Sequence, residues 1–487
     1  MRIITRLFKH CILIAGIAVL AGCAGTRTVD QKTAAAHLAN SDYKVYALQF
    51  LDDKGQPKYD PKSLLDVLEA GKAFNDAGLW QLSADAFETA GTLLHWKEDT
   101  VDTPEEVANL LGTTLTSDAF GAYQGKIHQG ALIDYYQATN MLMLGRASDA
   151  RVDFNRLQVR QSNAVKQLAS YASTVNKTVG EGLADEDGAV AKKSLLEVGP
   201  KVADGIKDLP SGLAKAKIRN AAGDVLGAVF RATSAERSDK SSNLSRDMLK
   251  SAAASSATRG GNAMIAYMNK QIRSGKGELS DKVIVVYEDG MGPSLKEFRI
   301  DLPLFLVTDK VTYTGIALPQ FQPGQPAYGG IQIGMGKSKA DTATLTDLNE
   351  LAGLEFDAAY KGIVAKAVIS TIIKTTAQAV INNQIDSELG GGLMGTLLKV
   401  GTGAAQYALT KADTRAWVNL PNTIQMAVID RPKNGTLALF TPAGAPLAEV
   451  ALPTASNSLV LIKASGIIGK PAIFTQALPA ETIVAGL

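Results

Sequence analysis

The chain has 487 residues, of which 46% are hydrophobic and 20% are charged, so it is long enough for two or three globular domains. Its formal net charge of +2 gives no general case for binding nucleic acid. The chain contains only two cysteines and four histidines, and the histidines lack the spacing of metal ligands. We therefore predict no disulfide framework, no metal and no cofactor.

Residues 1–22 have the pattern of a secretory signal peptide, because basic residues precede an apolar run, 12–20, that is too short to span a membrane as a mature helix. The segment ends in Leu20-Ala21-Gly22-Cys23, which resembles the lipobox of bacterial lipoproteins. In that family the cysteine is lipidated and the chain is cleaved before it. The alternative is an ordinary signal peptide followed by a chance cysteine.

The resemblance implies a protein anchored by lipid on Cys23. Ala24 stands where an aspartate would imply retention in the inner membrane, so the expected location is the outer membrane, facing the periplasm. Two or three acyl chains together hold a protein durably at a membrane. We expect residues 23–61, a polar leader with a short apolar segment, to form a lipidated tether.

Residues 62–275 are predicted to be helical. From Leu64 to Phe74 apolar residues recur every three or four positions, Gly78 interrupts the pattern, and a second amphipathic segment begins at Trp80. This pattern is typical of a helical hairpin.

The details of this hairpin resemble a tetratricopeptide repeat, which places a small residue where two helices cross and a large one beside it. Gly71 and Phe74 occupy two of the motif positions. The spacing of glycine, small residue and phenylalanine recurs once, in Gly78-x4-Ser83-x3-Phe87 and Gly145-x4-Ala150-x3-Phe154. The resemblance implies a tetratricopeptide-like helical domain, and a helical bundle with glycine turns is the alternative.

From Lys282 onward the pattern becomes typical of strands. Residues 283–287 are rich in β-branched side chains and residues 298–302 alternate apolar with polar, while the three prolines in 319–330 indicate a loop or an edge. Helical patterns then return at 344–383 and 393–409. Strand patterns resume from 413, with Asn434-Gly435 as a hairpin turn.

The predicted fold class is therefore α+β, with an N-terminal tetratricopeptide-like helical domain (62–275) and a C-terminal mixed domain (280–487). In the second domain strands flank a helical pair at 344–410, and we expect both sets of strands to join one sheet. Residues 362–381 are apolar enough to suggest a membrane span, but two lysines within them favour a buried core helix. Membrane insertion or pore lining is the alternative.

No catalytic residues are predicted. The Gly334-Met335-Gly336-Lys337-Ser338 segment suggests a phosphate-binding loop, but that motif needs a glycine where this chain has Ile331. No histidine stands near a serine in a known catalytic signature. A periplasmic enzyme acting on glycan or peptide would need a carboxylate or hydroxyl cluster that the sequence pattern lacks.

Candidate partner-binding residues fall into two groups. The first is aromatic and lies on the predicted helices: Trp80, Tyr123, Tyr135 and Tyr136. The second is Asp413, Arg415 and Trp417, where arginine could grip a carboxylate or stack on the indole. We favour a structural interpretation of the second group, in which Asp413 pairs with Arg415 and Trp417 fills the core.

Three places resemble a family of functionally uncharacterised bacterial outer-membrane lipoproteins with tetratricopeptide-like repeats: 286–290 with 298–303, the small-residue helix 361–374, and 412–417 with Leu420-Pro421. Within them the Asp413, Arg415 and Trp417 positions stand out most. The resemblance implies assembly with other cell-envelope proteins or outer-membrane lipoproteins, and it supplies no activity.

These patterns together predict a non-enzymatic, lipid-anchored periplasmic scaffold that binds other envelope proteins through its helical repeats. The alternative is a subunit of an outer-membrane export or pore assembly, which the apolar 362–381 segment suggests. That alternative predicts a homo-oligomer.

Overall fold

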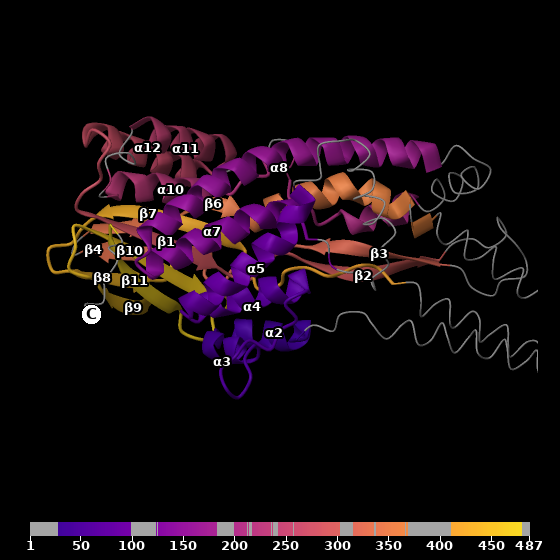
Figure 1. Cartoon of the computed structure of the whole chain (residues 1–487), viewed down its shortest axis with the longest axis horizontal. Coiled ribbons are helices and arrows are strands. Elements are labelled where there is room, and N and C mark those ends of the chain that lie inside the picture. The colour runs from indigo at the N-terminus through magenta and orange to yellow at the C-terminus, as the bar shows by residue number, and fades with distance from the viewer. Residues whose placement is uncertain are drawn as a thin grey trace, which may run out of the picture.

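The fold is known from a computed structural model that describes residues 28–98, 123, 125–182, 199–211, 213, 217–234, 236, 242–256, 258–301, 315–335, 338–365, 367–368 and 411–479. The signal peptide, Cys23 and most of 362–381 lie outside these residues. The predicted α+β class is confirmed: a helical region comes first, and β-sheets with an interleaved helix follow (Figure 1).

The helical region includes two short helices and seven longer ones within the described residues. They are α2 (Gln31–Ala39), α3 (Tyr43–Leu48), α4 (Leu64–Asp76), α5 (Trp80–Glu98), α7 (Ile127–Met143), α8 (Ala147–Gly182), α10 (Ala221–Thr233), α11 (Ser242–Ser255) and α12 (Arg259–Ser274). A 3-10 turn, η1, covers Ala203–Gly205, and residues 348–365 form the helix between the two sets of strands.

The strands form three sheets. Their bounds are β1 (Lys282–Asp289), β2 (Ser294–Asp301), β3 (Gly315–Gln322), β4 (Gln332–Met335), β5 (Ser338–Asp341), β6 (Ala343–Asp347), β7 (Thr423–Asp430), β8 (Thr436–Phe440), β9 (Pro446–Ala451), β10 (Asn457–Ala464) and β11 (Ala472–Leu478). A five-stranded sheet has the order β11-β10-β1-β7-β6, with β1 and β10 parallel. A four-stranded sheet has the order β5-β4-β8-β9, and β2 pairs with β3 alone.

The helical hairpin predicted from the glycine pattern is present. Gly78 ends α4 with a φ of 76° and Gly145 ends α7 with a φ of 71°, a conformation that favours glycine. Gly71 lies where α4 meets α5, because a Cβ there would be 3.0 Å from the Phe87 ring. Ser83 Oγ donates a hydrogen bond of 2.7 Å to the Gly71 carbonyl at the same crossing.

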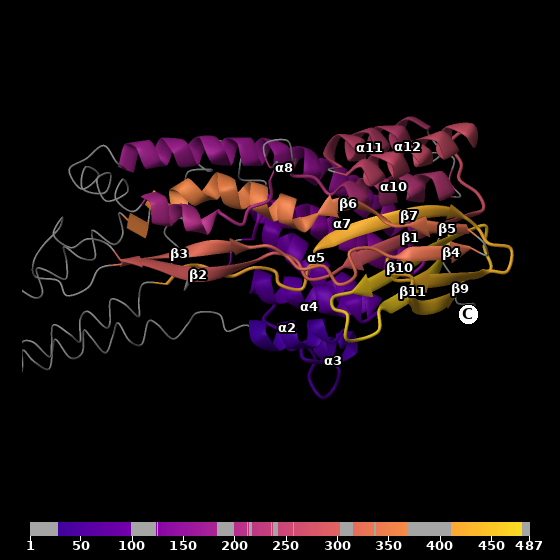
Figure 2. The same ribbon diagram turned by 180° about the vertical axis from the view of Figure 1, so that it is seen from behind.

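The molecule is built in three layers, with the five-stranded sheet in the middle (Figure 2). Side chains of β1 alternate between its two faces. Ile284 and Val286 pack into the cluster that contains the helices, whereas Val283 and Val285 pack against the four-stranded sheet. Helices and strands therefore share one core. The largest hydrophobic cluster includes residues from both sides of the predicted boundary at 275–280.

The expected tether is folded over the part that the structure describes. Residues 31–48 form α2 and α3, and Tyr43, Tyr46 and Phe50 are buried in the main core. The short apolar segment thus attaches the N-terminal residues to α4, where Phe50 packs edge-on against Phe74.

Two details of the strand prediction are wrong, and the expectation of an edge at Pro319 is confirmed. Pro319 lies inside β3, whose one partner among the described strands is β2. The helix expected from 344 begins at 348, because 343–347 form β6. Asn434-Gly435 makes a turn but no hairpin, since β7 and β8 enter different sheets; the hairpin there is β8 with β9.

The β2–β3 ribbon, η1 and helical residues 348–365 extend from the body beside α8 (Figures 1 and 2). They have their own apolar cluster, which includes Phe321 and Phe356. Glu355 joins this arm to the start of α7: its carboxylate accepts hydrogen bonds from the Ile127 N–H at 2.9 Å and the His128 N–H at 3.3 Å. His128 Nδ1 also lies 2.8 Å from Glu355 Oε2.

The Glu355 contact predicts a pH-dependent stability. Burial raises the pKa of the Glu355 carboxyl, but the contacts with His128 and the positive charge of Lys126 outweigh burial, and the net pKa is lowered. A carboxyl with a lowered folded-state pKa adds stability above its unfolded-state pKa and loses that contribution as pH falls through the folded-state value. We expect Glu355→Gln to reduce the free energy of urea unfolding by about 1–3 kcal/mol at pH 7. The loss should be much smaller at pH 3.

Glu88→Gln on the exposed side of α5 is the matched control, and it should change the unfolding free energy little at either pH. Equal losses for Glu355→Gln at both pH values would contradict a role for the ionised carboxylate.

Candidate functional site

The face of the helical layer that was expected to bind a partner is covered by the chain's own C-terminal part. Trp80 packs edge-on against Phe474 of β11, with ring centroids 4.9 Å apart. The Arg415 guanidinium lies over the Tyr123 ring at 5.8 Å from its centroid. Tyr135 and Tyr136 are 1% and 0% exposed. The prediction that these two tyrosines contact a partner is therefore wrong, because α7 is buried along most of its length.

The second predicted group has the structural roles that we favoured. Trp417 is 2% exposed, and its ring lies 5.9 Å from Phe87 and 6.1 Å from Tyr136. Arg415 binds Asp413 through two bonds, Nε to Oδ1 at 2.9 Å and Nη2 to Oδ2 at 2.8 Å. Burial raises the pKa of the Asp413 carboxyl, but the guanidinium outweighs burial and the net pKa is lowered.

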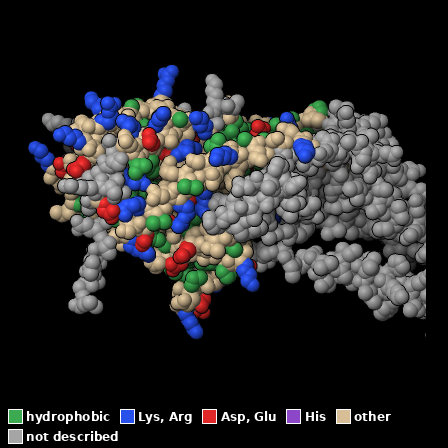
Figure 3. All heavy atoms as spheres, turned by 45° about the horizontal axis from the view of Figure 1, so that its top comes forward, with side chains coloured by type: hydrophobic (Ala, Val, Ile, Leu, Met, Phe, Trp, Pro, Cys, Tyr) green, Lys and Arg blue, Asp and Glu red, His purple; other side chains and the backbone are tan. Residues whose placement is uncertain are grey.

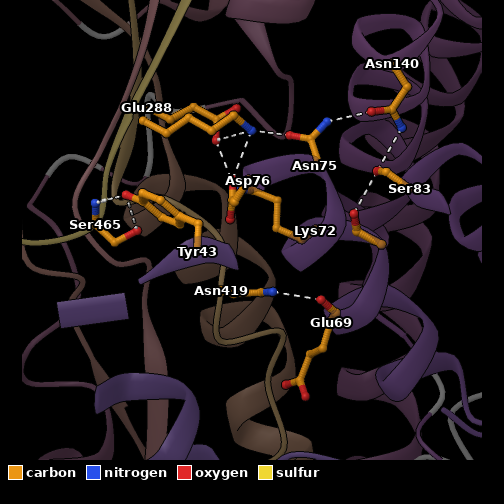
Figure 4. A network of polar contacts seen from close by, with 12 residues as sticks. Tyr43, Glu69, Lys72, Asn75, Asp76, Ser83, Asn140, Glu288, Asn419 and Ser465 are labelled. Carbon is orange, nitrogen blue, oxygen red and sulfur yellow. Dashed lines mark hydrogen bonds and ion pairs between the residues drawn. The ribbon is translucent and has the colours of Figure 1, made fainter. Parts of the chain in front are cut away.

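A buried cluster of four charged residues joins the helices to the central sheet (Figure 4). Lys72 and Asp76 come from α4, Glu288 from β1 and Lys463 from β10, and each side chain is at most 7% exposed. Lys72 Nζ lies 3.0 Å from Glu288 Oε2 and contacts Asp76 Oδ1 as well. Lys463 Nζ lies 2.9 Å from Asp76 Oδ1 and 3.6 Å from Glu288 Oε2. Two positive and two negative charges thus balance.

Strand register places the cluster. Glu288 and Lys463 are direct partners in the parallel β1–β10 pair, and both face the helices because they continue the alternation of Val286 and Leu461. Hydrogen bonds extend the cluster into the helical layer. Lys463 donates to Asn75, whose amide donates to Asn140 Oδ1 at 2.7 Å.

The two lysines differ in their electrostatics. Burial lowers the pKa of Lys463, the carboxylates only partly offset this, and the net pKa is lowered. Burial also lowers the pKa of Lys72, but the charges of Asp76 and Glu288 outweigh this effect, and the net pKa is raised. Sequence reasoning missed all four residues. The available signal was a lysine inside the otherwise apolar strand 459–464.

These residues hold the layers together. A buried ion cluster contributes little net stability, whereas removing one member leaves an uncompensated charge away from water. We expect Lys463→Met to reduce the free energy of unfolding by about 3–5 kcal/mol.

The double variant Lys463→Met/Glu288→Gln restores charge balance, because Lys72 and Asp76 remain as a pair. It should be less destabilised than the sum of its single variants in a double-mutant cycle measured by urea unfolding. Simple additivity of the two losses would contradict coupling within the cluster.

A groove lies at the edge of the five-stranded sheet, beside the part of β7 that β6 does not reach. β6 pairs with residues 423–426 of β7 and stops there, whereas residues 427–430 of β7 pair only with β1 among the described strands. The chain reaches β6 from β5, which belongs to the other sheet, and Thr342 between the two strands donates from its Oγ1 to Gln425 Oε1 at 2.7 Å. Among the described residues, half of the β7 edge has no strand partner.

Helix α12 forms the opposite wall of this groove, which has a volume of about 520 Å³. Thr258 fixes the wall, because its Oγ1 donates to the Thr344 carbonyl at 2.7 Å and accepts from the Gly261 N–H at 2.9 Å. Both apolar and polar residues line the groove: Thr258, Gly260, Met264, Tyr267, Ala340, Asp341, Thr342, Ala343, Thr344, Ala427 and Val428.

The surface around the groove is basic. Figure 3 turns the α11 and α12 side toward the reader, where lysine and arginine side chains outnumber acidic ones. Between residues 242 and 278 the exposed charged side chains are Arg246, Asp247, Lys250, Arg259, Lys270, Arg273, Lys276 and Glu278. The groove itself is lined by one charged side chain, Asp341, and Asp430 is exposed at the end of β7, so the basic surface lies on the helical side of the groove.

The remaining sequence hypotheses can be compared with the described part of the chain. Gly334 and Met335 belong to β4 and Ser338 begins β5, so a strand follows where a phosphate-binding loop needs a helix. Among the described residues no group of three or more histidine, cysteine or acidic side chains is placed to hold a metal. In the same residues no helix has the length and apolar character needed to cross a membrane.

Comparison with known proteins identifies no relative. No family model matches the chain, and neither the curated proteins nor the solved structures contain a match.

Proposed function

We propose that this protein is a lipid-anchored periplasmic scaffold that binds an extended segment of another cell-envelope protein in the groove between α12 and the open edge of β7. The observation that carries the proposal is the missing strand partner of residues 427–430 beside a groove of about 520 Å³.

An open strand edge binds an extended peptide by adding it as a further strand, with backbone hydrogen bonds supplying affinity and alternate side chains supplying specificity. Four residues of β7 correspond to about 13 Å of strand. A peptide bound here would continue the line of β6 and run antiparallel to β7. The basic surface of α11 and α12 favours a segment flanked by acidic residues.

The anchor and the location rest on the lipobox ending in Cys23 and on the resemblance to outer-membrane lipoproteins. The proposal differs from the sequence-based hypothesis in where the partner binds. The helical face around Trp80 and Tyr123 already contacts the C-terminal part of the chain, whereas residues 427–430 of β7 lack a second strand partner among the described residues and border the groove. The export or pore alternative depends on residues 362–381, most of which lie outside the described structure.

Blocking the groove tests the proposal. A Cβ at Gly260 would have only Ala343 Cβ nearby, at 3.5 Å, so Gly260→Leu should fill the groove without disturbing the fold. We expect this variant to lose the envelope proteins that the wild-type chain recovers by affinity purification from gently crosslinked outer membranes.

Gly91→Leu is the matched control, because Gly91 also lies in a helix and a Cβ there would have no atom within 4 Å. It should recover the same proteins as the wild type, and Cys23→Ser should recover none from the membrane fraction. Undiminished recovery by Gly260→Leu would place the binding site elsewhere and contradict the proposal.

A further inference from the structure

The loop between β10 and β11 displays two aliphatic side chains to solvent. Ile467 is 66% exposed and Ile468 is 76% exposed, although isoleucine is among the residues most often buried in proteins. Two glycines flank this pair, in Gly466-Ile467-Ile468-Gly469.

The loop is held firmly against the N-terminal helices. The Ser465 N–H donates to the Tyr43 hydroxyl at 2.7 Å (Figure 4). Gly466 and Gly469 lie directly on the backbone at the end of α2, so that a Cβ at either position would collide with the carbonyl oxygen of Ala39 or Asn40. The loop backbone is packed against α2 and Tyr43, and this packing holds the two isoleucine side chains in solvent.

Helix α3, which begins at the same tyrosine, adds to this surface. Its Val45 and Leu48 are 46% and 59% exposed, while its Tyr46 and Ala47 face the core. Four of the nine most exposed large apolar side chains in the described chain thus lie on α3 and the adjoining loop. Two adjoining elements each carry a pair of exposed aliphatic side chains, and exposed apolar surface of this kind marks a contact site.

The place of the lipid anchor indicates what this surface contacts. Thr28 is fixed to α4, because its N–H and hydroxyl donate to the Asp66 carboxylate at 3.0 and 3.2 Å. Cys23 lies five residues earlier, and five residues span at most about 18 Å. Helix α2 then covers about 13 Å between this point and the loop at Ala39. A bilayer that holds the Cys23 lipid is therefore within reach of the loop.

Exposed basic side chains border the surface. Lys44 and Lys470 flank the aliphatic residues, and long basic side chains reach phosphate headgroups while their stems cover apolar surface. The exposed positions of α2 itself include Lys32 and no acid. The exposed acids of this region are Asp30 at the N-cap of α2, Asp42 between α2 and α3, and Asp52 and Asp53 on the following turn.

We propose that α3 and the β10–β11 loop form a second contact with the membrane, in which Val45, Leu48, Ile467 and Ile468 enter the headgroup region next to the lipid anchor. This inference rests on the anchored location proposed above and is independent of the groove. The contact would define the orientation of the protein relative to the bilayer.

A single probe at residue 468 tests the contact. The chain has no cysteine besides Cys11, in the signal peptide, and Cys23, whose sulfur the lipid would block. Ile468→Cys in the lipidated protein is then the one free thiol, and it can carry an environment-sensitive NBD dye. In phospholipid vesicles we expect a blue-shifted emission and at least a twofold quenching by doxyl-labelled lipids.

Val159→Cys is the matched control, because Val159 is 62% exposed on α8, away from the N-terminal helices. Its dye should keep the emission of an aqueous site and escape quenching, whereas Leu48→Cys should behave like Ile468→Cys. Vesicle flotation reports the anchor separately. Protein that floats while the dye at 468 behaves like the dye at 159 overturns this contact alone, and protein that fails to float overturns the anchor and the contact together.

Discussion

The arrangement of this protein depends on four charged side chains that meet out of water between α4 and the central sheet. Lys72, Asp76, Glu288 and Lys463 balance one another only when α4, β1 and β10 lie in this one alignment. Sliding β10 by one residue would turn Lys463 to the opposite face of the sheet and leave two carboxylates with one lysine. An unpaired buried charge costs several kcal/mol, so the cluster selects one packing among the many that apolar contacts alone would allow.

That alignment decides where a partner can bind. With α4 fixed on the sheet, Trp417 fills the space between Phe87 and Tyr136, and Asn419 donates to the Glu69 carbonyl at 2.8 Å. The helical layer therefore contacts residues 417–419 of its own chain with a surface that a repeat protein would offer to a ligand. The groove lies on the same face of the sheet as α4 but at the β6 edge, where β6 pairs with only part of β7 among the described strands.

Local features of the fold could be predicted from the sequence, and long-range ones could not. The glycines at 78 and 145 and the period of the strands act within a few residues, so their patterns identify the elements. The pairing of β1 with β10 joins residues about 175 apart, and no local pattern carries it. The burial of Tyr135 and Tyr136 depends on a sheet that follows much later in the chain. The groove could not be predicted either, because it results from a strand that stops early.

Native-state hydrogen exchange measures the opening free energies of amides in α4 and β10. It tests whether the helices and the sheet form one cooperative unit joined at the charge cluster. If they do, the slowest amides of the two elements open with the same free energy and respond equally to low concentrations of denaturant. The reason is that unfolding either element alone would leave a buried charge unpaired. If α4 opens well before β10, while the sheet keeps its protection, the helices form a separate unit and the account is contradicted.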